Sequence, residues 1–232
     1  MRRLAKVLVE CGAAALCLAM VVACTVVKLD KNKAAGNQYS AWEKTGKSFQ
    51  ADQYVAAEWD KQVLPAYEKD AVDFGTVLGA LQADRKSAVV RYGVKKEAGA
   101  VTYIFKVRGN ATVVKYDNSS RNGVLRVSME PSGSKQGATL QVGPVIVGTI
   151  IRDSLDFIRF TDIGNQLQFA DLANQLNARM TKDSVATIDL ATIAGKRISF
   201  LGCFALDEDQ GLDNIVITPV KIVRIEAGGA GK

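Results

Sequence analysis

Residues 143–177 read GPVIVGTIIRDSLDFIRFTDIGNQLQFADLANQLN. An apolar, β-branched run ends abruptly in Arg152 and Asp153, and a polar turn follows it. The next segment, to about Met180, has the pattern of a helix that carries side-chain amides at Asn165, Gln166, Asn174 and Asn177. We predict strands before and after this helix.

Five strand-like segments flank the helix, three before it and two after it: residues 101–116, 124–129, 138–151, 196–206 and 215–225. Turn-forming residues separate most of them. Gly109 predicts a bend in the long first strand, and Gly143-Pro144 predicts a break in the third. This order is the layout of an OB-type barrel in which the helix closes one end. The helix would bury Leu167, Ala170, Ala173 or Asn174, and Leu176 or Asn177.

Residues 48–93 have helical spacing and predict a small lobe of three or four short helices. Pro65 should end or kink the first helix. Asp73 and Asp84 are expected N-caps of the later helices. Trp59 reads most simply as the core anchor of this lobe, and sugar stacking by Trp59 or Trp42 is the alternative.

The N-terminus has the three parts of a lipoprotein signal. A short basic region precedes an apolar run, and Val21-Val22-Ala23-Cys24 matches a lipobox. The apolar run is short for a membrane span, which needs about 20 apolar residues. We therefore expect cleavage before Cys24 and acylation of its thiol, palmitate included, which would anchor the chain to a lipid bilayer on the periplasmic side of the cell envelope. Thr25 hints at the outer membrane, but the sequence leaves the choice of membrane open.

Composition excludes several kinds of site. The chain of 232 residues contains no histidine, which removes Ser-His-Asp and Cys-His catalysis and histidine-bound zinc. We find no calcium-binding loop and no phosphate-binding loop, and we expect no metal and no cofactor. Loss of the signal peptide would lower the formal charge from +6 to +4, too mild a charge to require nucleic acid. Cys203 would be the free cysteine of the mature domain, buried and inert.

The predicted organisation is α+β, with a small N-terminal helical domain before an OB-like five-stranded barrel. The boundaries are a signal peptide at residues 1–23, a lipidated N-terminus and tether at 24–47, a helical domain at 48–95, an OB-like domain at 96–226 and a disordered tail at 227–232.

A set of motifs carries a family resemblance: Val21-Val22-Ala23-Cys24, Trp59-Asp60 with Val63-Leu64-Pro65, Tyr92-Gly93, Gly143-Pro144-Val145, Gly148-Thr149, Arg152-Asp153, Phe160 with Asp162, Asn165-Gln166, Phe169-Ala170, Asn174, Asn177 and Ile217-Thr218-Pro219-Val220. Over nearly the whole mature chain, the sequence resembles a family of predicted periplasmic lipoproteins, domain-of-unknown-function family 2291. The resemblance implies a helical domain followed by an OB-like α/β domain. It also implies a gene setting beside ABC transporters for sugars of the ribose type, but no known activity and no proven site residues.

The candidate binding residues are Arg152, Asp153, Asp162, Asn165 and Gln166, because carboxylates and amides are the groups that hydrogen-bond sugar hydroxyls. The structural alternative is that Asp162 caps the helix and Arg152 pairs with a nearby carboxylate. That alternative is favoured because capping and local pairing need no ligand. Asp153 with Asp156 as a glycosidase pair is a weaker reading.

Four functions follow from these patterns. The leading hypothesis is a non-enzymatic, membrane-anchored accessory to an ABC-type sugar uptake system. The second is a lipoprotein that binds carbohydrate directly at the polar corner of the OB-like domain. A carboxylate-based hydrolase is the third. Nucleic-acid binding, frequent among OB-type barrels, is the fourth, and export to the envelope and the low charge argue against it.

Overall fold

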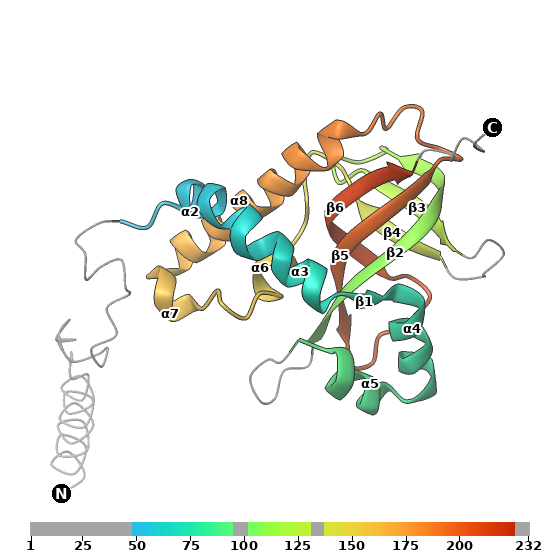
Figure 1. Cartoon of the computed structure of the whole chain (residues 1–232), viewed down its shortest axis with the longest axis horizontal. Helices are drawn as coiled ribbons and strands as arrows, with labels where there is room; N and C mark the ends of the chain where they lie inside the picture. Colours follow the sequence, from blue (N-terminus) through green and yellow to red (C-terminus); the bar gives the residue numbers. More distant parts are fainter. Residues whose placement is uncertain (1–47, 95–101, 131–136, 226–232) are drawn as a thin grey trace, which may run out of the picture. The chain divides into compact units, whose positions relative to one another are not determined.

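The computed structural model describes residues 48–94, 102–130 and 137–225 (Figure 1). The expected signal peptide, Cys24, the tether with Trp42 and the tail at 227–232 lie outside these ranges. Within them, no helix is long and apolar enough to cross a bilayer. Side chains from the helices and from the sheet belong to the same hydrophobic core.

The first helical segment continues through Pro65 and does not end there. It consists of α2 (Ala51–Glu58), the π-helical turn η2 (Trp59–Val63) and α3 (Leu64–Asp70). Pro65 stands in the first turn of α3, where a missing N–H costs least, and the wide π turn precedes it. Trp59 is 1% exposed, which confirms it as a core residue.

The two predicted N-caps are confirmed. Asp73 accepts a hydrogen bond from the Thr76 N–H at 2.9 Å and begins α4 (Phe74–Ala83). Asp84 accepts one from the Ser87 N–H at 3.3 Å and begins α5 (Arg85–Tyr92). The helices pack onto the sheet, since the rings of Phe74 and Phe204 lie 6.0 Å apart.

In the described residues the sheet has six strands: β1 (Val72–Asp73), β2 (Thr102–Asp117), β3 (Val124–Met129), β4 (Gly137–Gln141), β5 (Arg197–Asp207) and β6 (Val216–Ile225). Their order is β1-β2-β3-β4-β6-β5, and β5 also pairs with β2, so the pairing returns to the second strand of this order. β1–β2 and β4–β6 are parallel, whereas the other pairs are antiparallel. The five expected strands are present, and β1 adds a sixth.

The third strand is shorter than the sequence predicts. β4 ends at Gln141, just before the predicted break at Gly143-Pro144, but the strand does not resume after it, and residues 150–153 form the short helix α6 (Ile150–Asp153). The backbone of the 121–123 turn packs closely against Gly143. A Cβ there would lie 2.4 Å from the Gly123 nitrogen, so this position has no room for a side chain.

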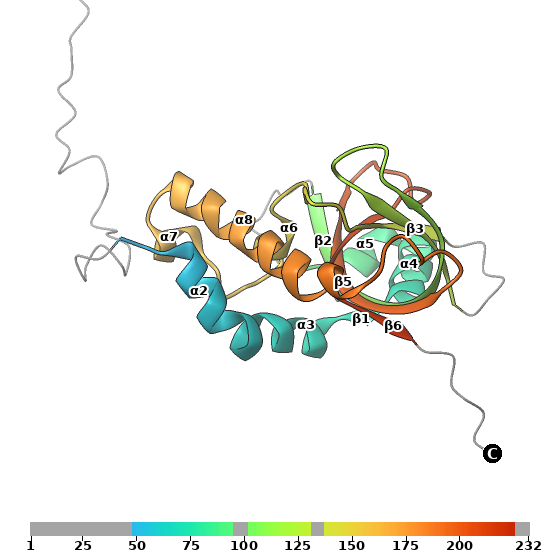
Figure 2. The same ribbon diagram turned by 90° about the horizontal axis from the view of Figure 1, so that it is seen from above.

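The helix between β4 and β5 is present, and the prediction of its buried face is confirmed for Ala173, Leu176 and Asn177 but wrong for Leu167 and Ala170. After α7 (Phe160–Ile163), α8 (Gln166–Asp183) buries Leu172, Ala173, Leu176, Asn177 and Met180. Leu167 is 84% exposed and Ala170 is exposed too. The first half of α8 extends beyond the sheet beside α2, and only its C-terminal end, before η3 (Val185–Thr187), reaches β6 (Figure 2).

Candidate functional site

Most of the buried polar side chains gather around one segment, residues 147–154. Seven polar or charged residues are buried in the described part of the chain. Five of them either lie in this segment or are linked to it by hydrogen bonds. We call these five residues the polar frame: Gln141, Arg152, Ser154, Asn177 and Thr218. Burying a polar group is costly unless it is hydrogen-bonded, so the frame has to be satisfied internally.

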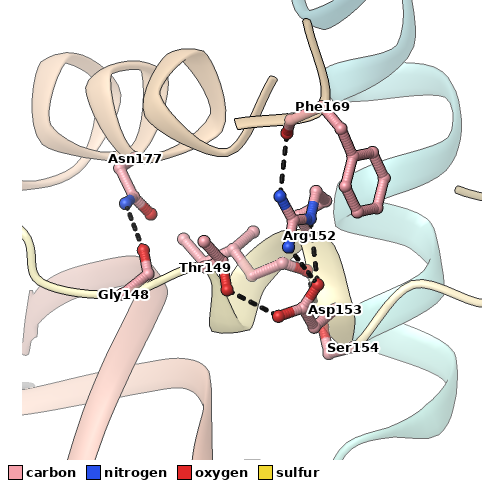
Figure 3. A network of polar contacts seen from close by, with 8 residues as sticks. Gly148, Thr149, Arg152, Asp153, Ser154, Phe169 and Asn177 are labelled. Carbon is pink, nitrogen blue, oxygen red and sulfur yellow. Dashed lines mark hydrogen bonds and ion pairs between the residues drawn. The ribbon is translucent and has the colours of Figure 1, made fainter. Parts of the chain in front are cut away.

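Side-chain amides hold the start of the segment. The Gln141 carboxamide makes two bonds with the backbone of Val147, accepting from its N–H at 2.9 Å and donating to its carbonyl at 3.2 Å. The same amide donates to the Thr218 hydroxyl at 2.8 Å. Asn177 donates to the Gly148 carbonyl at 2.9 Å (Figure 3), and Gly148 has a φ of +98°, which favours glycine.

Arg152 holds the end of the segment. Its Nε and Nη2 donate to the same oxygen of Asp153, Oδ1, at 2.9 and 2.7 Å. Its Nη1 donates to the Phe169 carbonyl at 2.8 Å, and its guanidinium carbon lies 3.7 Å from the centre of the Phe169 ring (Figure 3). The other oxygen of Asp153, Oδ2, accepts from the Thr149 hydroxyl at 2.6 Å. The prediction that Arg152 pairs with a nearby carboxylate is therefore confirmed.

Beneath the segment, Ser154 of the polar frame is linked through Tyr67 to Cys203 in the core. The Tyr67 hydroxyl lies 2.6 Å from Ser154 Oγ and 3.0 Å from Cys203 Sγ. Burial raises the pKa of the Cys203 thiol to about 12 and the pKa of Tyr67 well above its usual value. Both groups stay protonated at neutral pH, and Cys203 is the buried, inert thiol that the sequence predicts.

The other candidate residues lie away from the frame. Asn165, not Asp162, caps α8, because its side chain accepts from the Gln168 N–H at 3.0 Å. Gly164, with a φ of 121°, ends α7 and moves the helix start past Asp162. Asp162 instead pairs with Arg159 at 2.8 Å. Asn165 and Gln166 are exposed, so the five candidates do not form one site.

A hollow of about 370 Å³ lies between the segment and the sheet. Its lining combines polar and apolar side chains: Thr102, Ile104, Gln141, Val147, Gly148, Thr149, Ile150, Asp153, Ala205, Gln210, Val216 and Thr218. Of the candidates, Asp153 lines it. Sequence reasoning missed Gln141 and Thr218, although each is a polar residue at a buried position of a strand, which was the available signal.

Asp156 faces elsewhere. It lines a separate hollow of about 380 Å³ together with Arg91, Asp70 and Lys106, and Lys106 forms an ion pair with Asp70 at 3.0 Å. Asp153 and Asp156 therefore do not face the same hollow, which argues against a shared glycosidase centre. Across the described residues, no three His, Cys, Asp or Glu side chains come together as a metal site.

Comparisons with known proteins agree with the fold and give the family. A crystal structure of an OB-fold protein from Thermotoga maritima is similar, with a TM-score of 0.63 and 16% identity over 77% of this chain and 100% of that one. No curated protein matches the chain. The family model described as "Predicted periplasmic lipoprotein (DUF2291)" matches residues 14–223. Because this match covers most of the sequence, the chain belongs to that family of predicted periplasmic lipoproteins and is a membrane-anchored protein of the cell envelope.

Proposed function

We propose that this protein is a non-enzymatic, membrane-anchored accessory to an ABC-type sugar uptake system, and that it binds a small carbohydrate directly. The observation that carries the binding role is the hollow beside Asp153, which is built on buried polar side chains. Ligand sites are usually concave and largely apolar, with a few fixed polar groups.

The chemistry of the hollow suits a hydroxylated ligand of monosaccharide size. Its volume of about 370 Å³ lies at the small end of the range for ligand pockets. Asp153, Gln141 and Thr218 offer oxygen atoms that accept hydrogen bonds from hydroxyl groups. Aliphatic walls such as Ile104 and Val216 can cover the carbon faces of a sugar ring. No lysine or arginine is found among the described residues that line the hollow, which speaks against nucleic acid as its ligand.

The polar frame makes the hollow rigid before any ligand arrives. Gln141 holds Val147, Asn177 holds Gly148 and Arg152 holds Asp153. A site whose groups are already ordered loses less conformational entropy on binding. This is the reason to read the frame as the support of a binding site rather than as ordinary loop anchoring.

A binding role without catalysis fits the same contacts. The sequence has no histidine, and the Asp153 carboxylate already accepts from Arg152 and Thr149. A general base or nucleophile needs a free, reactive group within reach of the substrate. Asp153 is instead fixed as a hydrogen-bond acceptor.

Direct binding is tested by calorimetry with a panel of pentoses and hexoses. We expect Thr218→Val to weaken the affinity for the bound sugar by about tenfold, because it removes one hydroxyl from the lining. Thr139→Val, on β4 but outside the lining, is the matched control and should change little. The binding role is wrong if no sugar in the panel gives measurable heat.

The accessory role is tested separately in cells. Deletion of the gene should reduce uptake of the sugar that binds, and the full-length gene should restore it. Cys24→Ala removes the expected lipidation site and should fail to restore uptake fully. Unchanged uptake in a clean deletion strain would contradict the accessory role while leaving direct binding intact.

A further inference from the structure

We infer that the hollow selects neutral sugars over anionic ones, and that Asp153 is the residue that sets this selection. The inference rests on the proposed carbohydrate binding and gives it a ligand class. It follows from the charges that line the hollow and from the way in which Asp153 is held.

Among the described residues that line the hollow, Asp153 is the one with an ionisable side chain. Its partner Arg152 does not line the hollow, because the guanidinium lies against the Phe169 ring and bonds to the Phe169 carbonyl (Figure 3). The negative charge therefore faces the ligand space, and the compensating positive charge lies behind it.

The two oxygens of Asp153 have different surroundings. Arg152 occupies Oδ1 with two bonds, whereas Oδ2 accepts one bond from Thr149 and keeps a further lone pair. The side chain is 25% exposed. A sugar hydroxyl can donate to Oδ2, whereas a carboxylate or phosphate group cannot donate and is repelled by the carboxylate.

The hollow that contains Asp156 provides a contrast. Arg91 and Lys106 line it together with the carboxylates of Asp70 and Asp156, so cations are available there to receive an anionic group. In the described part of the chain, no such cation lines the hollow at Asp153. Charge alone would then direct anionic sugars away from the proposed site.

The test uses matched pairs, each a neutral hexose and its uronic acid, measured with the full-length lipoprotein in detergent micelles. For the hexose that binds in the panel, we expect the wild type to prefer the neutral member by at least about tenfold. Asp153→Asn should reduce that preference to about threefold or less, because the amide oxygen still accepts a hydrogen bond but the charge is gone. Asp156→Asn is the matched control and should leave the preference unchanged.

The outcomes separate the inference from the proposal beneath it. If neither member of any pair binds, carbohydrate binding is overturned and the selection with it. If both members bind equally well, the selection is overturned and carbohydrate binding stands. If Asp153→Asn does not fold, the wild-type preference for the neutral sugar is measured at different salt concentrations instead. Raising the salt from about 10 mM to about 1 M should reduce a charge-based preference, and an unchanged preference would refute a role for the Asp153 charge.

Discussion

Two arginine–aspartate pairs lie within a few residues of each other, and they differ in what surrounds them. Arg152, which belongs to the polar frame, and its partner Asp153 have side chains that are 10% and 25% exposed; we call them the frame pair. At the tip, which we define as residues 159–166, Arg159 and Asp162 have side chains that are 71% and 39% exposed. Arg152 of the frame pair also bonds to the Phe169 carbonyl and lies against the Phe169 ring, whereas both side chains of the tip pair are more exposed to solvent. The same chemical pair should therefore fix the structure in one place and contribute little in the other.

Arg152→Ala should have the largest effect on stability. It removes the guanidinium from Asp153, from the Phe169 carbonyl and from the Phe169 ring. We expect a loss of about 3 kcal/mol in the free energy of unfolding, measured by urea denaturation, because a largely buried charge loses its partner.

Arg159→Ala is the matched control for that change. It breaks the exposed pair with Asp162 and should alter stability by less than about 0.5 kcal/mol. Equal losses from the two substitutions would remove the distinction between frame and tip.

Asn177→Leu should have the next largest effect. The Gly148 carbonyl would lose its donor while the helix keeps a side chain of similar size. The expected loss is about 1.5 kcal/mol, the upper end of what one hydrogen bond contributes, because Asn177 is buried but Gly148 is exposed. Asn174→Leu, one turn earlier on the exposed side of α8, should change the unfolding free energy by less than about 0.5 kcal/mol. If Asn174→Leu destabilised the protein as much as Asn177→Leu, the hydrogen bond from Asn177 to Gly148 would not be the cause of the loss.

The stability of the fold at alkaline pH should show how well the Cys203 thiol is shielded from water. In the unfolded chain the Cys203 thiol loses its proton near its usual pKa of about 8.5, whereas the fold keeps the proton up to a pKa of about 12. The folded state thus binds more protons in this window. The neutral thiol therefore makes its full contribution to the free energy of unfolding below the pKa of the unfolded chain. Above that pKa the free energy of unfolding falls by up to about 1.4 kcal/mol per pH unit.

The measurement is urea denaturation between about pH 8 and about pH 10, with Cys203→Ala as the control, because the other titrating groups are common to both proteins. Tyr67, whose pKa is also raised by burial, adds a decline of the same sign at higher pH. Parallel pH profiles for wild type and Cys203→Ala would mean that the thiol titrates normally in the fold.

Asn165→Ala should have the smallest of these effects. It removes the N-cap bond to the Gln168 N–H at the start of α8. A lost cap costs about 1 kcal/mol, and Gln166→Ala beside it should cost almost nothing. If Gln166→Ala cost as much as Asn165→Ala, the assigned cap would be wrong.

The sequence predicted the fold well where the cause is local. The caps at Asp73 and Asp84 and the bounds of β3, β5 and β6 follow from short patterns of a few residues. It failed where distant segments decide. The segment after the predicted Gly143-Pro144 break forms α6 instead of continuing the third strand, and Leu167 is exposed because that end of α8 extends past the sheet.

The site divides in the same way. The Arg152–Asp153 pair was predictable because the two residues are neighbours in the chain. Gln141 and Thr218 could not be placed beside them, since 77 residues separate these two and only the sheet brings them together. Asp162 was taken for the cap because Gly164 gave no sign of where α8 would start.

The unequal pairing of the strands has a consequence for local opening of the sheet. β2 and β5 are joined over eleven residue pairs, whereas β4 and β6 share only two. The hollow lies across that short pairing, with Gln141 on one strand and Val216 and Thr218 on the other. Amide protons there should exchange sooner than those of β2 and β5. A bound molecule that spans both strands would slow this exchange, which makes amide hydrogen exchange a direct reporter of occupancy.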